Sequence, residues 1–169
     1  MMIDIHPEEH FQKEMEEMSV KGSRLMKETY APRFLVVEDD ASIQPVWERI
    51  IRTIDPQAII RWSRTGEGAE FLIEQQRKRH GVFDFIVADV MLAGKMTGVD
   101  LWRKHPESES LFLFVSALSP KKFNEMVGKD RDRFPFLVNK PIDPIECIES
   151  IRAMFAYRHA FLGKNGRPS

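Results

Sequence analysis

The stretch FLVVEDD, residues 34–40, decides how this chain folds, because a short apolar run stops on three acids, Glu38, Asp39 and Asp40. Such a run is typical of a strand buried on both faces of a parallel sheet. Residues that follow the strand lie at the carboxyl edge of the sheet, where open α/β sheets place their ligand sites. Acids in this position can also simply cap the next helix, and Asp39 or Asp40 taken alone would favour that interpretation.

Other apolar runs later in the chain end on polar or charged residues in the same way. Asp89 ends the run in DFIVADVM, residues 84–91, and Lys140 follows the run in PFLVNKP, residues 135–141. Ser116 ends a further run, LFLFVSA. Taken singly, the serine would be a loop hydroxyl and the lysine a surface residue. Together with the acids of the first run they suit a divalent cation and a phosphoryl group at one edge of a sheet.

Strands and helices alternate strictly from residue 33 onward, which predicts an α/β domain. The expected strands cover about residues 33–38, 58–62, 83–89, 111–115 and 134–139, with helices between them. Helix starts are indicated by Thr65, by Ser119 followed by proline, and by Asp143 in an Asp-Pro-Ile-Glu sequence. This alternation predicts a parallel sheet covered by helices on both faces.

The composition restricts the classes of function. Apolar residues make up 43% of the 169 residues and charged residues 30%, with a net charge of −1, which is ordinary for a globular domain. Nucleic-acid binding is disfavoured because no basic stripe is present. No apolar run is long enough to span a bilayer and the first residues do not resemble a signal peptide, so we expect a cytoplasmic protein. The single cysteine, Cys147, excludes an internal disulfide.

Residues 1–31 differ from the rest of the chain and are interpreted as an N-terminal helical extension. A helical stripe of apolar residues recurs at Phe11, Met15, Met18 and Leu25. Three alternatives stay open: a helix folded back on its own domain, a helix that forms a homodimer, and a largely disordered arm. The domain itself is expected over residues 32–160, followed by a flexible tail over 161–169.

Four motifs in order resemble the receiver domain of bacterial two-component response regulators, which are CheY-like proteins. They are VVEDD after the first strand, ADVMLAGKMTG after the third, VSA after the fourth and NKP after the fifth, within residues 33–158. The resemblance implies a flavodoxin-like, doubly wound, five-stranded parallel sheet with strand order 2-1-3-4-5. It further implies a Mg²⁺-dependent signalling domain that catalyses only its own aspartyl phosphorylation and dephosphorylation.

The resemblance also assigns residue roles. Asp89 matches the aspartate that accepts the phosphoryl group, and Asp39, with its neighbour Glu38, matches the acids that bind Mg²⁺. Met91 would offer a backbone carbonyl to the same metal. A carboxylate that attacks a phosphorus surrounded by negative oxygens meets strong repulsion, and a hard cation held by oxygen ligands cancels much of it.

The hydroxyl and the lysine complete the site implied by the resemblance. Ser116 matches the hydroxyl that contacts the phosphoryl oxygens, and Lys140 matches the lysine that pairs with them, in a Lys-Pro bond that is cis in the family. Two positions depart from the family. Leu137 stands where the switch aromatic is usual, and Ala93 stands where a proline is usual. The aromatic switch is therefore not expected in its usual form.

The function expected from the resemblance is a stand-alone receiver. It would take a phosphoryl group from a histidine kinase or phosphotransfer protein onto Asp89 and then bind an unidentified downstream protein or pass the group on. One alternative is an adaptor that has the same fold, never turns over phosphate and acts through residues 1–31. A second, an aspartyl-nucleophile hydrolase, is disfavoured because Met91 stands where a second acid would be expected.

Overall fold

A computed structural model of the chain describes residues 30–106, 109–133 and 135–161. One compact unit extends from Ala31 to Ser150, and the chain from Ile151 onward belongs to a second unit. The predicted N-terminal helical stripe and most of the predicted tail lie outside the described residues. The predicted boundaries between these three segments therefore stay predictions.

The described part of the chain forms one five-stranded sheet in which every neighbouring pair of strands is parallel. The order β2-β1-β3-β4-β5 is the one that the resemblance implied, so the flavodoxin-like prediction is confirmed. Each strand is within about two residues of its predicted position. The strands are β1 (Arg33–Val37), β2 (Ile59–Ser63), β3 (Phe85–Asp89), β4 (Leu111–Ser116) and β5 (Phe136–Asn139).

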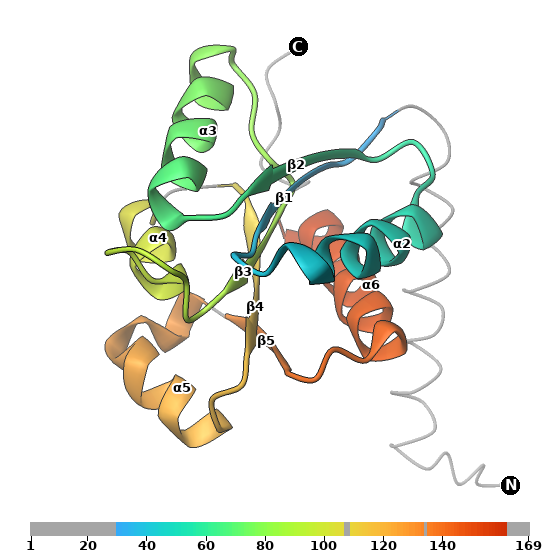
Figure 1. Cartoon of the computed structure of the whole chain (residues 1–169). Coiled ribbons are helices and arrows are strands. Elements are labelled where there is room, and N and C mark those ends of the chain that lie inside the picture. The colour runs from blue at the N-terminus through green and yellow to red at the C-terminus, as the bar shows by residue number, and fades with distance from the viewer. Residues whose placement is uncertain (1–29, 107–108, 134, 162–169) are drawn as a thin grey trace, which may run out of the picture. The chain divides into compact units, whose positions relative to one another are not determined.

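Helices connect the strands and cover the sheet. Figure 1 shows α3, α4 and α5 on one side of the sheet and α2 on the other. Short 3-10 helices precede α2 and follow α5, and neither was predicted from the sequence. The helical elements are η1 (Ala41–Ile43), α2 (Gln44–Ile54), α3 (Gly66–Lys78), α4 (Gly98–Lys104), α5 (Pro120–Val127), η2 (Gly128–Arg133) and α6 (Pro144–Phe161).

The core lies between the sheet and its helices because β1, β3 and β4 are apolar and almost entirely buried. On the α3–α5 side, Phe114 of β4 packs against Trp102 of α4 and Phe123 of α5, with ring centroids 5.7 and 5.3 Å apart. On the opposite side, α2 buries Trp47 completely. A side chain of this size contributes roughly 1.5–3 kcal/mol or more when fully buried. Trp47 and Trp102 are thus packing residues of the core.

Local capping explains where the helices begin. Thr65 accepts a hydrogen bond from the Gly68 amide, and Ser119 accepts one from the Lys122 amide, so both predicted N-caps are confirmed. Asp143 accepts hydrogen bonds from the two amides that open α6. These side chains satisfy backbone donors that have no partner within the helix, which fixes each helix start close to the carboxyl edge of the sheet.

Among the described residues, no helix combines the length and the apolar character needed to cross a membrane.

Candidate functional site

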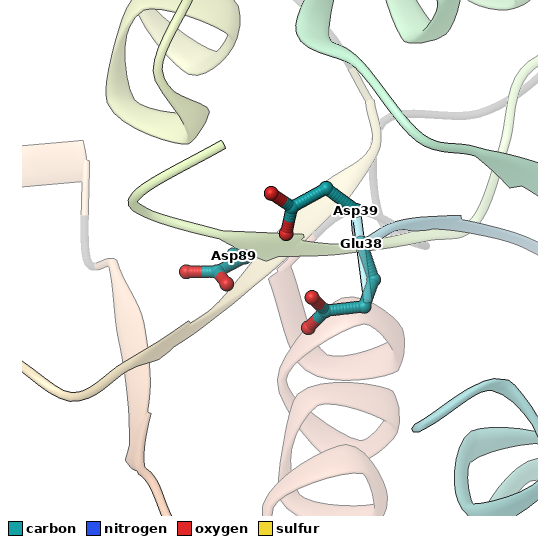
Figure 2. Close-up of side chains that lie close together, drawn as sticks. All are labelled: Glu38, Asp39 and Asp89. Carbon is teal, nitrogen blue, oxygen red and sulfur yellow. The ribbon is translucent and has the colours of Figure 1, made fainter. Parts of the chain in front are cut away.

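The ends of β1 and β3 bring three carboxyl groups together at the carboxyl edge of the sheet. Glu38 and Asp39 follow β1 directly, and Asp89 is the last residue of β3. One carboxylate oxygen from each lies within 4.8 Å of the others, and Figure 2 shows the three side chains gathered around the ends of the two strands. The convergence predicted from the strand-ending acids is therefore present in the structure.

Lys140, which follows β5, reaches across the sheet edge to two of these acids. Its Nζ donates hydrogen bonds to Asp89 Oδ2 at 2.7 Å and to Glu38 Oε2 at 3.3 Å. Its backbone amide donates to the Ser116 carbonyl at 2.8 Å, which continues the β4–β5 pairing past the strand ends. The Lys140–Pro141 peptide bond is cis, as the resemblance led us to expect.

Asp89 is fixed by the chain that follows it. Its Oδ1 accepts a hydrogen bond from the Met91 amide at 3.0 Å. Gly98, the first residue of α4, donates its amide to the Val90 carbonyl at 3.0 Å, and a Cβ at Gly98 would overlap the Asp89 backbone carbonyl. The glycine is required here because the helix start packs directly on the backbone of Asp89.

Asp39 is held by two contacts that the sequence did not reveal. The Ala93 amide donates to Asp39 Oδ2 at 3.2 Å, and Arg64 Nη2 donates to the Asp39 carbonyl at 3.2 Å. Neither contact has a sequence signature, because one uses a backbone amide and the other an arginine in an ordinary loop. Asp40, in contrast, is exposed and its carboxylate caps η1 by accepting from the Ser42 amide at 2.9 Å. The helix-capping interpretation thus applies to Asp40.

The electrostatics of the site reflect burial of several charges of the same sign. Burial raises the pKa of Glu38, and repulsion from Asp89 raises it further. The hydrogen bond from the Asp40 amide and the positive charge of Lys140 lower this pKa, but the overall shift is upward. Burial alone would lower the pKa of Lys140, but its hydrogen bond and charge interaction with Asp89, with a further contribution from Glu38, raise it overall. Lys140 therefore stays protonated and offsets only part of the acidic charge.

The donor set fits a hard divalent cation. All three groups offer carboxylate oxygens, which Mg²⁺ and Ca²⁺ prefer to nitrogen or sulfur. Asp39 is partly exposed, whereas Glu38 and Asp89 are buried, so the cluster opens to solvent on the Asp39 side. A single ammonium group shared between Glu38 and Asp89 leaves net negative charge available for a cation.

The remaining predicted residues are Ser116, Leu137 and Met91. Ser116 is fully buried at the end of β4, and its Oγ accepts a hydrogen bond from the Leu118 amide at 3.0 Å, which leaves the hydroxyl proton available for donation. Leu137 of β5 is partly buried and packs against the hydrophobic cluster under α3–α5. Met91 is exposed next to Asp89, with 57% of its surface accessible, so a partner can approach on that side.

Comparison with known proteins gives structural matches only. No protein-family model and no curated protein matches the sequence. A response regulator receiver domain protein (CheY-like) from Methanospirillum hungatei superposes with a TM-score of 0.64 at 18% identity, covering 81% of this chain and 100% of that chain. The signal receiver domain of an HD domain-containing protein from Pseudomonas fluorescens gives a TM-score of 0.65 at 16% identity, with coverages of 82% and 96%.

A response regulator receiver protein from Burkholderia phymatum is also similar, with a TM-score of 0.58 at 21% identity over 73% of this chain and 94% of that chain. These identities are low, and the likeness is one of fold. The chain therefore has the fold of CheY-like receiver domains.

Proposed function

We propose that the chain is a response-regulator receiver that accepts a phosphoryl group on Asp89 in the presence of Mg²⁺. The observation that carries this proposal is the contact of Lys140 with Asp89 and Glu38 at an edge where Asp39 also lies. A lone acidic cluster would be common on a protein surface. A buried nucleophilic carboxylate paired with a lysine, beside a cation-binding oxygen set and within a receiver fold, supports phosphoryl transfer.

The metal would be held by the carboxylates of Glu38, Asp39 and Asp89 and by the Met91 carbonyl. When bound, Mg²⁺ supplies charge neutralisation between the attacking carboxylate and the phosphoryl oxygens. The chain's own residues supply the orientation: the Met91 amide holds one oxygen of Asp89, and Lys140 holds the other. The Asp89 carboxylate is therefore preorganised before a phosphodonor arrives.

The donor we propose is a phosphohistidine on a kinase or phosphotransfer protein. One oxygen of Asp89 forms a bond to phosphorus while the phosphorus–nitrogen bond of the donor breaks, and the electron pair remains on the imidazole nitrogen. Lys140 Nζ is placed to exchange its contact with Asp89 for one with a phosphoryl oxygen, and the Ser116 hydroxyl can donate its proton to another. The product is an acyl phosphate on Asp89.

Signalling would follow from the altered charge at this edge of the sheet. A phosphoryl group can change affinity for a downstream protein only as far as that partner distinguishes the two states. Leu137 is packed against the hydrophobic cluster, so no aromatic side chain at residue 137 can carry the signal. We propose that the loop after Ser116 carries it instead, because the Ser116 hydroxyl would move on phosphorylation.

Intact-protein mass measurement after incubation with Mg²⁺ and a small phosphodonor tests this function. We expect wild type and Asp40→Asn to gain the mass of one phosphoryl group and Asp89→Asn to gain none. Asp40→Asn is the matched control because it removes an adjacent carboxylate that contacts Ser42 and not the cluster. If wild type gains no mass, the proposal fails and the adaptor alternative remains.

A further inference from the structure

Asp39 is the one acid of the cluster that is not buried, and it is held by residues from two different loops. Glu38 and Asp89 are only 7% and 6% exposed, whereas Asp39 is partly exposed. A carboxylate at the solvent boundary keeps more conformational freedom than a buried one, and this freedom is lost when it binds a cation. Contacts that restrict Asp39 beforehand should therefore strengthen cation binding.

Arg64 supplies one of these contacts, and the residues on both sides of it are held by hydrogen bonds. It follows the last residue of β2, Ser63, whose carbonyl accepts the Glu38 amide at 3.0 Å. The Ser63 hydroxyl donates to the Thr65 carbonyl at 2.8 Å, and Thr65 caps α3. Both neighbours of Arg64 are thus fixed to the sheet or to a helix, and its guanidinium donates to the Asp39 carbonyl across 25 residues of sequence.

We propose that Arg64 is a positioning residue for the metal site, which holds the Asp39 backbone so that its carboxylate faces those of Glu38 and Asp89. This inference rests on the Mg²⁺ site of the proposed function. The Ala93 amide assists from the opposite loop by donating to Asp39 Oδ2. Arg64 acts through Asp39 and is not itself a ligand, because a guanidinium has no acceptor atom to offer a cation.

Because Arg64 is positively charged, a positioning role can be distinguished from a purely electrostatic effect of its charge on the bound cation. A positive side chain near a cation site repels the cation, so removing the charge alone should make Mg²⁺ bind more tightly. Removing the positioning contact should make it bind more weakly. The two effects have opposite signs, and the direction of the change identifies which one dominates.

The experiment is calorimetric titration of the full chain with Mg²⁺, comparing wild type, Arg64→Met, Arg64→Lys and Arg61→Met. Methionine has a similar length but no donor, and lysine keeps the charge and one donor group. Arg61 is the matched control, an exposed arginine of β2 that lies three residues before Arg64. Urea unfolding of each metal-free variant shows whether the fold itself is affected.

We expect Arg64→Met to weaken Mg²⁺ binding about tenfold, the low end of the range for residues that orient metal ligands. Arg64→Lys should recover part of the affinity and Arg61→Met should equal wild type, with unfolding midpoints unchanged. The rate of phosphorylation by a small phosphodonor should recover at saturating Mg²⁺, because only the metal dependence shifts. Equal or tighter Mg²⁺ binding by Arg64→Met would overturn the role of Arg64 alone. Wild type that binds no Mg²⁺ would overturn the proposed metal site and this role with it.

Discussion

At the scale of the residue, the fold changes the chemistry of Glu38. It lies at the end of a central strand, is buried, and faces Asp89 across the sheet edge. Burial and this neighbour raise its pKa, and neither the amide of Asp40 nor the ammonium of Lys140 fully compensates. An ionised group in such a place costs stability and is retained where function needs it. This cost in the metal-free protein is consistent with the cation-ligand role that we propose for Glu38.

We expect Glu38→Gln to leave the metal-free protein at least as stable as wild type at pH 7. Glutamine keeps an oxygen acceptor for the Asp40 amide and removes the disfavoured charge. The sign follows from linkage: a carboxyl group with a raised folded pKa binds its proton more readily in the folded state. Its ionisation therefore lowers the free energy of unfolding as pH rises from about its ordinary value of 4.5 through the raised value.

Urea unfolding at pH 7 with and without Mg²⁺ checks this expectation. The variant should also lose most of the stabilisation that Mg²⁺ gives to wild type, because binding to the folded state alone raises the free energy of unfolding. A metal-free Glu38→Gln protein destabilised by more than about 1 kcal/mol would show that the Lys140–Glu38 ion pair outweighs the cost of burial.

At the scale of elements, α4 links the site to the rest of the domain. Thr97 caps this helix in a capping box, since its Oγ1 accepts from the Asp100 amide at 3.0 Å and its own amide donates to Asp100 Oδ2 at 2.9 Å. The next residue, Gly98, packs on the Asp89 backbone. At the other end of the helix, Arg103 pairs with Asp130 of η2 at 2.9 Å. The helix is thus fixed at both ends, beginning beside the proposed phosphoryl acceptor.

Thr97→Ala is expected to lower the free energy of unfolding by about 1 kcal/mol, as for other lost N-caps. Thr97→Ser keeps the hydroxyl and should lower the free energy of unfolding by at most a few tenths of that amount. The comparison separates the effect of the cap from that of the methyl group. Urea unfolding of the two variants beside wild type gives the comparison. Equal losses in both variants would assign the effect to packing of the threonine methyl group.

At the scale of the whole molecule, we expect buried His105 to make global stability depend on pH. It is the C-cap of α4 and 4% exposed, and its Nδ1 lies 3.4 Å from Arg77 Nη2. Burial lowers its pKa, and the positive charge of Arg77 lowers it further, against smaller opposing effects of Glu74 and Glu70. The folded state therefore favours the neutral imidazole.

We expect wild type to lose more stability than His105→Gln when the pH falls from 7.5 to 5.5. The unfolded chain protonates this residue near its ordinary pKa of 6.5, and the folded chain protonates it only at lower pH. The contribution of neutral His105 to the free energy of unfolding is thus complete above about pH 6.5. It is lost as the pH falls toward the folded pKa, by at most about 1.4 kcal/mol per pH unit. Denaturant unfolding at both pH values provides the test. Parallel curves for the two proteins would mean that His105 does not contribute.

The sequence predicted the strands and most helix starts because their causes are local. It also predicted that Asp89 and Lys140 lie close together. Apolar runs specify buried strands, Thr65 and Ser119 cap helices within three residues of themselves, and parallel strands all end at one edge. The strand order came from the resemblance, since periodicity alone does not state which strands are neighbours.

The contacts that hold Asp39, the two 3-10 helices and the burial of His105 were decided only by the tertiary structure. The Arg64 and Ala93 contacts join residues 25 and 54 positions apart, and one uses a backbone amide that every residue except proline possesses. Residue types and their spacing therefore specified which groups reach the sheet edge. The conformations of the loops, fixed by packing between distant segments, determined how those groups are oriented there.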